Sequence, residues 1–338
     1  MTTADLEAIA NRMVEGGRGI LAADESSGTA NKRLTSVNVD PTEDNRRDYR
    51  EMLFRTPDLG KYISGTILYD ETLRQNAADG TPFTKLLADQ DIMPGIKVDT
   101  GAMVLAGSPN EKITEGLDGL RDRLNEYVEM GAKFTKWRAV ITIGDGIPSG
   151  YCIKANAHAL ARYARLVQEA GMVPIVEPEV LMDGSHSIET CQEVTENTLH
   201  TVFNALVGQG VALEGMILKP NMVISAMDCS TQASVEQVAE WTVQTLKRRV
   251  PAAVPGIAFL SGGQSELLAS QHLNAMNQLG DLPWTLSFSY GRALQHSALH
   301  TWAGSSDQVT AGQSKLAHRS HMNFAAAVGK YSADLEAA

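Results

Sequence analysis

A lysine follows a short apolar run in residues 215–222, whose sequence is Gly-Met-Ile-Leu-Lys-Pro-Asn-Met. Residues 216–218 are predicted to form a buried strand, which Pro220 ends because proline has no N–H for the ladder. Lys219 is then expected at a strand's C-terminal end, where α/β proteins build active sites. A lysine that loses its proton easily there can form a Schiff base with a carbonyl. The alternative is an ordinary strand-end lysine that reaches solvent.

Charged residues also follow four other apolar runs. Residues two apart on a strand share a face, so each pair is expected to point the same way. The charged residues are Asp24, Lys97 and Asp99, Lys136 and Arg138, and Glu177 and Glu179. One such pair alone is more often a solvated strand end. Five strands ending in this way favour a shared site instead.

The mixture of charges has a chemical interpretation. Lys136 and Arg138 near Lys219 would disfavour its protonated form by like-charge repulsion. Glu177 and Glu179 would transfer protons, and one could act as acid while the other acts as base.

Two further runs end in glycine-containing loops, which are typical of phosphate sites. Barrel enzymes often bind phosphate after their seventh and eighth strands, through backbone N–H groups at a helix N-terminus. Glycine allows a close backbone approach, and Arg292 adds charge-assisted hydrogen bonds. The predicted contacts are Ser261, Gly262, Gly263, Ser289, Gly291 and Arg292.

A second basic cluster, made of Lys32, Arg33, Arg46 and Arg47, could bind another anion. The alternative interpretation is a solvated helix face.

Eight short apolar runs must position these groups, and helical patterns separate them. The runs span 19–23, 62–69, 94–98, 133–141, 173–180, 216–218, 257–260 and 285–289. Near-continuous apolar character is typical of parallel strands covered on both faces. The alternation predicts an α/β fold, a single (β/α)₈ TIM barrel over residues 1–338. An open doubly wound sheet is the alternative, but the GxGxxG that it usually carries after its first strand is missing.

Helical stripes and caps support this fold. Apolar stripes predict helices over 117–128, 157–167 and 235–246, the last opened by a Ser234…Gln237 capping box. Thr81-Pro82 is interpreted as an N-cap followed by proline at the first helical position. We also expect an extra N-terminal helix around 6–13, a C-terminal helical segment, and a loose tail over 332–338.

Composition excludes several classes of protein. The net charge of −11 argues against a general nucleic-acid binder. Three cysteines without a CxxC indicate neither a disulfide framework nor a zinc–thiolate site, and fit a reducing compartment. No run of about 18 apolar residues occurs, so no membrane association is expected, and we predict a soluble cytoplasmic protein. His296 and His300 lack an HExxH pattern, so no metal is predicted.

The sequence resembles class I fructose-bisphosphate aldolases, the metal-independent Schiff-base type, from about residue 6 to 331. The matching motifs are Gly-Ile-Leu-Ala-Ala-Asp-Glu-Ser (19–26), Asn-Lys-Arg-Leu (31–34), Pro-Gly-Ile-Lys-Val-Asp (94–99), Lys-Trp-Arg (136–138), Val-Glu-Pro-Glu (176–179), Leu-Lys-Pro-Asn-Met (218–222), Leu-Ser-Gly-Gly-Gln (260–264) and Ser-Tyr-Gly-Arg-Ala-Leu-Gln (289–295). The resemblance implies reversible cleavage of fructose 1,6-bisphosphate to dihydroxyacetone phosphate and glyceraldehyde 3-phosphate, without a cofactor. It also implies a homo-oligomer, with a tetramer as one form.

The resemblance also implies roles for single residues. Lys219 would form the Schiff base, Glu177 would move protons with Glu179 beside it, and Lys136 would stabilise the carbinolamine. Asp24 would take the C4 hydroxyl proton. The glycine-loop residues would hold the C1 phosphate. The C6-phosphate side would comprise Lys32, Arg33, Arg46, Lys97, Arg138 and Thr29, the last in place of the family's serine.

One departure concerns the C-terminus. Many family members end in a mobile tail whose terminal tyrosine assists proton exchange on the enamine. This chain ends Ser-Ala-Asp-Leu-Glu-Ala-Ala after Tyr331, which belongs to an upstream motif. The group that serves this step, and the preference among fructose, tagatose and sedoheptulose bisphosphates, stay open. A sugar-phosphate sensor or scaffold without catalysis, and a metal-dependent aldolase, are the alternative functions.

Overall fold

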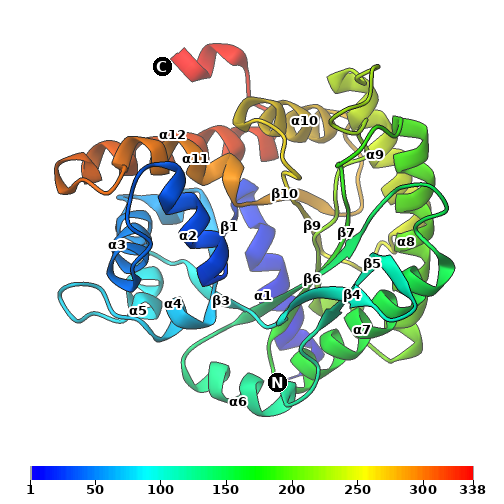
Figure 1. Ribbon diagram of the computed structural model, residues 1–338, viewed down its shortest axis with the longest axis horizontal. Coiled ribbons are helices and arrows are strands. Elements are labelled where there is room, and N and C mark those ends of the chain that lie inside the picture. Colours follow the sequence, from blue (N-terminus) through cyan, green and yellow to red (C-terminus); the bar gives the residue numbers. More distant parts are fainter. Residues whose placement is uncertain (1, 338) are drawn as a thin grey trace.

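A closed barrel of eight parallel strands forms the centre of the computed structural model, which describes residues 2–337 (Figure 1). Met1 and Ala338, part of the predicted domain and tail, lie outside this range. The barrel strands are β1 (Gly19–Ala23), β2 (Ile63–Leu68), β3 (Met93–Lys97), β6 (Phe134–Ile141), β7 (Val173–Val180), β8 (Ile217–Leu218), β9 (Gly256–Phe259) and β10 (Thr285–Tyr290). The order β1-β10-β9-β8-β7-β6-β3-β2 closes through β1 and β2. The predicted TIM barrel and its eight strands are confirmed, and the doubly wound alternative is excluded.

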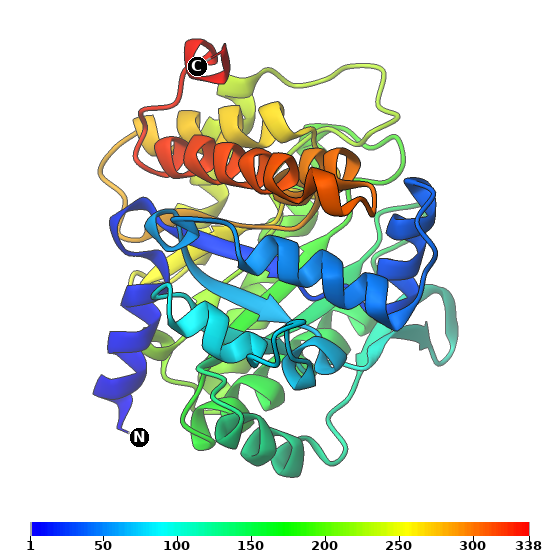
Figure 2. The same cartoon turned by 90° about the vertical axis from the view of Figure 1, so that its left-hand side faces the viewer.

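Helices surround the barrel, and three of them match the apolar stripes predicted over 117–128, 157–167 and 235–246. The surrounding helices are α2 (Ser27–Ser36), α3 (Glu43–Phe54), α4 (Asp70–Arg74), α5 (Phe83–Ala88), α6 (Leu120–Glu129), α7 (Gly150–Glu169), α8 (Ile188–Gly208), α9 (Val235–Arg249), α10 (Glu266–Gln278), α11 (Arg292–Trp302) and α12 (Val309–Ala327). The predicted capping box of α9 is present, with Ser234 and Gln237 bonding each other's backbone. Helices α11 and α12 lie side by side across one face (Figure 2).

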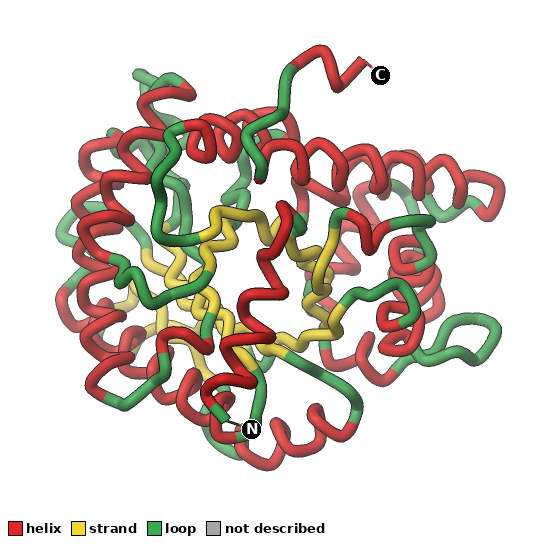
Figure 3. Tube along the Cα trace, turned by 180° about the vertical axis from the view of Figure 1, so that it is seen from behind, coloured by secondary structure: helices red, strands yellow, loops and turns green. Residues whose placement is uncertain are grey.

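The predicted N-terminal helix, α1 (Thr3–Val14), closes the N-terminal end of the barrel. Its buried residues Leu6, Met13 and Val14 join an apolar cluster with inward side chains of the strands. Seen from behind, the helix crosses the ring of strands (Figure 3). The opposite end, where the strands finish, therefore provides the open mouth.

Phe134 fills the barrel interior because two neighbouring strands carry glycine opposite it. A Cβ on Gly65 would lie 2.8 Å from the Phe134 ring, and one on Gly95 would overlap the ring. The two glycines therefore make room for one large aromatic side chain in the lower layer of the barrel.

One predicted helix start is wrong by one residue. Helix α5 begins at Phe83, and Pro82, not Thr81, occupies the N-cap. Thr81 belongs to the preceding loop, because its carbonyl accepts a hydrogen bond from the Ala77 N–H at 2.8 Å. Asn76 and Pro82 form the bridge that closes this loop.

Two elements differ from the sequence-based picture. An antiparallel hairpin, β4 (Gly101–Leu105) and β5 (Ser108–Glu115), was not predicted. At the C-terminus, residues 333–337 form a 3₁₀ turn where a loose tail was expected. Its Glu336 carboxylate accepts from the Arg319 guanidinium at 2.6 Å and from the Tyr331 hydroxyl at 2.9 Å, which ties the turn to α12.

Among residues 2–337, no helix combines the length and apolar character that crossing a bilayer would require.

Candidate active site

The C-terminal ends of the strands converge on one cavity of about 830 Å³. Most predicted site residues line it: Asp24, Thr29, Arg33, Lys97, Lys136, Arg138, Glu177, Glu179, Lys219, Ser261, Gly262, Gly263, Ser289, Gly291 and Arg292. The parallel barrel explains this convergence, because every strand delivers its last residues to the same mouth.

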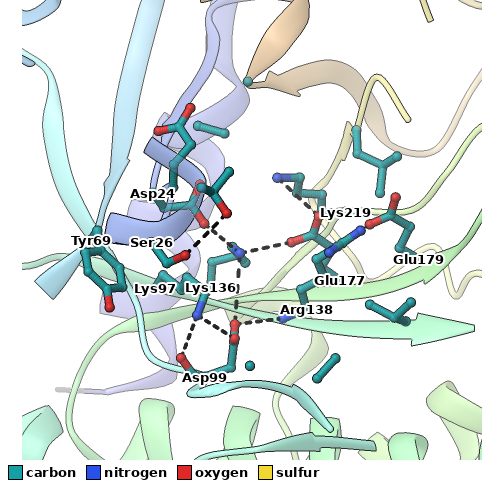
Figure 4. A pocket seen from close by; sticks show the side chains of 18 of the residues that line it. Asp24, Ser26, Tyr69, Lys97, Asp99, Lys136, Arg138, Glu177, Glu179 and Lys219 are labelled. Atoms are coloured by element: carbon teal, nitrogen blue, oxygen red, sulfur yellow. Dashed lines mark hydrogen bonds and ion pairs between the residues drawn. The ribbon is translucent and has the colours of Figure 1, made fainter. Parts of the chain in front are cut away.

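Lys219 lies directly after β8 and is held inside the barrel. Its backbone N–H donates to the Val176 carbonyl of β7 at 2.8 Å, which continues the sheet by one residue. Its side chain is 5% exposed, and the Nζ lies 3.4 Å from the Oε1 of Glu177 (Figure 4). The alternative of a lysine reaching into solvent is therefore excluded.

Glu177 stands between two lysines. Its Oε1 faces Lys219, and its Oε2 lies 3.6 Å from the Nζ of Lys136. That Oε2 atom is buried and has no hydrogen-bond partner among residues 2–337. The carboxylate therefore touches the candidate nucleophile while it keeps one oxygen available for a proton or a hydroxyl.

Lys136 also joins Glu177 to Asp24. Its Nζ lies 2.6 Å from the Asp24 Oδ2 and 4.0 Å from the Asp99 Oδ2. Burial alone would lower the pKa of Lys136, but Asp24, Glu177 and Asp99 outweigh it and raise this pKa above its ordinary value. Burial alone would raise the pKa of Asp24, but Lys136 and Lys219 lower it to about 2. Asp24 is therefore ionised and Lys136 protonated near neutral pH.

The structure corrects the prediction that Lys136 and Arg138 repel the Lys219 ammonium. Lys136 and Arg138 do line the same cavity, but each faces a carboxylate. Lys136 pairs with Asp24, and the Arg138 guanidinium pairs with Glu179. Since the nearby cations are paired, and Glu177 stands between Lys136 and Lys219, the repulsion is largely offset.

Asp99 was named among the charged strand-end residues, but no catalytic or binding role was assigned to it. It lies two residues after Lys97, on the same face of the strand end, and its side chain is 3% exposed. One oxygen pairs with the Lys97 Nζ at 2.6 Å, and the other accepts from the Arg138 backbone N–H at 3.3 Å. Asp99 therefore fixes the Lys97 ammonium and ties the end of β3 to β6.

The two glycine loops carry the geometry of an anion site. Gly262 and Gly263 have φ of +56° and +90°, in the left-handed region that favours glycine. A Cβ on Gly263 would stand 3.2 Å from the Nη2 of Arg292, so the guanidinium lies against the loop. The Ser289 hydroxyl is buried with no partner among the described residues, and is free to donate to a ligand.

Two predicted phosphate contacts do not line the cavity. Lys32 is exposed on α2, where consecutive residues point about 100° apart, so only its neighbour Arg33 faces the mouth. Arg46 of α3 bonds Glu71 at 2.7 Å and the Asn31 side chain at 2.9 Å. Its guanidinium therefore forms an ion pair that joins α3 to α4, and a sequence pattern does not reveal this contact.

Two other residues were not predicted for the site. The Glu25 carboxylate pairs with Arg33, and its second oxygen pairs with Arg50 of α3. Glu25 lies in a matching motif beside Asp24, which was a usable signal. Arg50 carried no signal, because it lies in the middle of a helix.

No three His, Cys, Asp or Glu side chains within residues 2–337 are grouped as metal ligands. The His296 and His300 rings on α11 have centroids 4.2 Å apart and planes tilted by 46°.

Comparisons with known proteins identify relatives that match nearly the whole chain. A family model described as fructose-bisphosphate aldolase class-I matches residues 5–338. A probable fructose-bisphosphate aldolase class 1 of Xanthomonas campestris is 58% identical over 98% of this chain and 99% of its own length. The cytosolic fructose-bisphosphate aldolase 6 of Arabidopsis thaliana is 53% identical over 97% of this chain and 92% of its own.

A solved structure is also similar. The fructose-bisphosphate aldolase of Plasmodium falciparum, solved in complex with TRAP and a small-molecule inhibitor, superposes with a TM-score of 0.97 at 48% identity. The match covers 98% of this chain and 96% of that one.

Proposed function

The chain belongs to the class I fructose-bisphosphate aldolase family, and from that premise we propose which of its residues carry each step of the reaction. The reaction is the reversible cleavage of fructose 1,6-bisphosphate to dihydroxyacetone phosphate and glyceraldehyde 3-phosphate. In class I enzymes it proceeds through a lysine Schiff base. The single observation that carries the assignment is the buried Lys219 ammonium 3.4 Å from the Glu177 carboxylate.

Schiff-base formation falls to Lys219 and Glu177. The Lys219 amine attacks the C2 carbonyl of the open-chain ketose after Glu177 has taken a proton from the ammonium. Glu177 then returns a proton to the C2 hydroxyl of the carbinolamine, which leaves as water and gives the iminium. Lys136 stabilises the carbinolamine oxygen through its positive charge, and Glu179 lies beside Glu177 with its charge balanced by Arg138.

Carbon–carbon cleavage falls to Asp24. Its carboxylate takes the proton of the C4 hydroxyl as the C3–C4 bond breaks. The bonding electrons move to the iminium nitrogen, which gives the enamine and releases glyceraldehyde 3-phosphate. A pKa of about 2 makes Asp24 a weak base, so proton transfer must accompany the bond cleavage rather than precede it.

Two groups of residues around the cavity are assigned to the two phosphates. We assign the C1 phosphate to Ser261, Gly262, Gly263, Ser289, Gly291 and Arg292, supported by the loop geometry and the unpartnered Ser289 hydroxyl. We assign the C6-phosphate side to Thr29, Arg33, Lys97 and Arg138, all of which line the cavity. Lys32 and Arg46 are not assigned to the C6 phosphate, because neither residue lines the cavity.

We further propose that the protein is cytoplasmic and forms a homo-oligomer, with a tetramer as the expected form. Two Arabidopsis relatives named as cytosolic support the location. Native mass measurement tests the subunit number, and fractionation of the source cells tests the location.

Borohydride trapping tests the nucleophile. Reduction in the presence of dihydroxyacetone phosphate should add the triose phosphate to one peptide, at Lys219. The Lys219→Arg variant should lose the adduct and at least about 10³-fold in kcat. Lys32→Arg is the matched control, since Lys32 is exposed and lies outside the cavity, and it should keep both. An adduct on another lysine would contradict the assignment.

A further inference from the structure

Three charged side chains lie in a row that runs from the cavity mouth into the protein. The Glu25 carboxylate joins two guanidinium groups, that of Arg33 through one oxygen and that of Arg50 through the other. Exposure falls along the row, from 23% for the Arg33 side chain to 6% for Glu25 and 3% for Arg50. Arg33 and Glu25 line the cavity, whereas Arg50 does not.

We propose that Arg50 is a positioning residue for substrate phosphate, acting through Glu25 on Arg33. Arg50 touches no substrate in this arrangement. It sets the orientation of the Glu25 carboxylate and the charge that Arg33 presents. The proposal rests on the assignment of Arg33 to phosphate binding made above.

The charge balance of the row explains why a second arginine is needed. A carboxylate shared between two guanidinium groups leaves a net charge of +1 in the row. Without Arg50, the Glu25 charge would be opposed by Arg33 alone, and that pair would be neutral. Phosphate is a dianion that binds best to an uncompensated guanidinium, so Arg50 preserves the charge that Arg33 offers.

Geometry gives the row a second role. A carboxylate with two oxygens held by two partners cannot rotate, so Glu25 presents a fixed acceptor to Arg33. Arg33 in turn lies near the loop after β10, since its Nη2 would be 3.8 Å from a Cβ on Gly291. A freely rotating Glu25 would let the Arg33 guanidinium shift within the cavity mouth.

Helix α3 anchors the row to the rest of the site. The Arg50 guanidinium lies 5.4 Å from the ring centroid of Tyr49. The Tyr49 hydroxyl donates to the Gln295 side chain at 3.0 Å, and Gln295 donates to the Ala22 carbonyl at 2.7 Å. Ala22 lies two residues before Asp24 on β1. The same helix therefore braces the strand end that carries Asp24 and the carboxylate that holds Arg33.

Arg319 provides a matched control. It is likewise a buried arginine, on α12 and 4% exposed, and it pairs with the Glu336 carboxylate of the turn over residues 333–337, but it does not line the cavity. Replacing either arginine by methionine removes one buried ion pair and should lower the melting temperature. Only the Arg50 change should alter phosphate binding.

The test compares Arg50→Met, Arg50→Lys and Arg319→Met with the full-length protein. KM and kcat are measured with fructose 1,6-bisphosphate, and the inhibition constant is measured with inorganic phosphate. Arg50→Met should raise KM and the inhibition constant about tenfold, with kcat within about threefold of the parent. Arg50→Lys keeps the positive charge but lacks the paired N–H donors of a guanidinium, so it should restore part of the affinity for phosphate. The lysine variant also provides the test if the methionine variant does not fold.

Two results would overturn the proposal. One is Arg50 variants whose KM and phosphate inhibition match those of the parent. The other is an Arg319→Met variant with the same rise in KM, which would reduce Arg50 to general stability. Failure of the functional assignment looks different, because the parent protein itself would then fail to cleave the bisphosphate or to be trapped at Lys219.

Discussion

The Nζ of Lys136 and the Oδ2 of Asp24 lie 2.6 Å apart, with 4% and 13% of their side chains exposed. This contact joins β6 to the residue that follows β1, and these two strands are not neighbours in the barrel. It brings Asp24, the proposed proton acceptor for bond cleavage, against the cation that also faces Glu177. In the proposed mechanism, Schiff-base formation and bond cleavage therefore share the Lys136 ammonium.

Removing this ammonium should change the pH dependence of catalysis. In Lys136→Met, Asp24 keeps its burial, which raises its pKa, and loses the largest opposing influence, so the pKa rises from about 2. We expect the acid limb of the kcat/KM profile to move to higher pH, together with a fall in kcat. An unmoved acid limb would show that Asp24 does not set it.

The same variant should change stability in acid. The pKa of Asp24 is lower in the folded state than the usual value of about 3.9. Its stabilisation is therefore complete above about pH 4 and is lost as the pH falls through the folded-state pKa. In Lys136→Met the pKa of Asp24 rises, so this stabilisation is smaller, and the parent should lose more stability in acid than the variant does. Urea unfolding between about pH 3 and pH 7 measures the difference, and parallel curves for both proteins would contradict the expectation.

Arg46 and Arg33 should behave differently, although both came from one predicted basic cluster. Arg46 is bound by Glu71 and lies outside the cavity, so Arg46→Met should leave KM within about twofold. Arg33→Met removes a guanidinium that lines the cavity, and should raise KM at least about tenfold. Steady-state kinetics on both variants checks this, and an equal rise in KM would restore Arg46 to the phosphate site.

The strand-end residues were predictable because a strand has a period of two. Lys219 follows an apolar run, whereas Glu177 and Lys136 lie within strands β7 and β6, and a parallel barrel brings these positions to one cavity. Helix residues were harder to place. Lys32 and Arg33 are adjacent in sequence, and only the packing of α2 decides which of them faces the cavity. Arg50 was not found, because its role depends on the position of α3 beside the loop that carries Glu25.

The hairpin β4–β5 escaped prediction for another reason. Its first strand does carry an apolar run, Ala102 to Leu105, but Met103 and Val104 are 46% and 55% exposed. The second strand is mostly polar, so sequence alone offered no partner strand for that run. Its register comes from backbone pairing between Gly101 and Glu115, which sequence periodicity does not report.

Gly263 should be sensitive to the smallest side chain. Its φ of +90° disfavours alanine, and an added Cβ would press on the Arg292 guanidinium at 3.2 Å. Gly263→Ala should lose about 1–2 kcal/mol of stability from backbone strain, and its KM should rise because Arg292 shifts. Gly107→Ala is the control, because Gly107 has a φ of +77° with nothing within 4 Å of the Cβ position and lies outside the cavity. Gly107→Ala should lose stability through backbone strain, but its KM should not change. A rise in KM in both variants would mean that backbone strain alone, and not the contact with Arg292, raises KM.

Tyr331 should not serve the enamine. Its side chain is 7% exposed, its hydroxyl lies 2.9 Å from the Glu336 Oε1, and it does not line the cavity. Burial and Glu336 raise the pKa of Tyr331 to about 12, so the hydroxyl stays protonated at neutral pH. Tyr331→Phe should therefore keep the cleavage rate and the rate of hydrogen exchange from dihydroxyacetone phosphate into water, while losing a hydrogen bond worth about 1 kcal/mol. Exchange followed by NMR in deuterium oxide checks this. A fall of about fivefold or more in exchange alone would mean that Tyr331 leaves Glu336 and reaches the substrate during turnover.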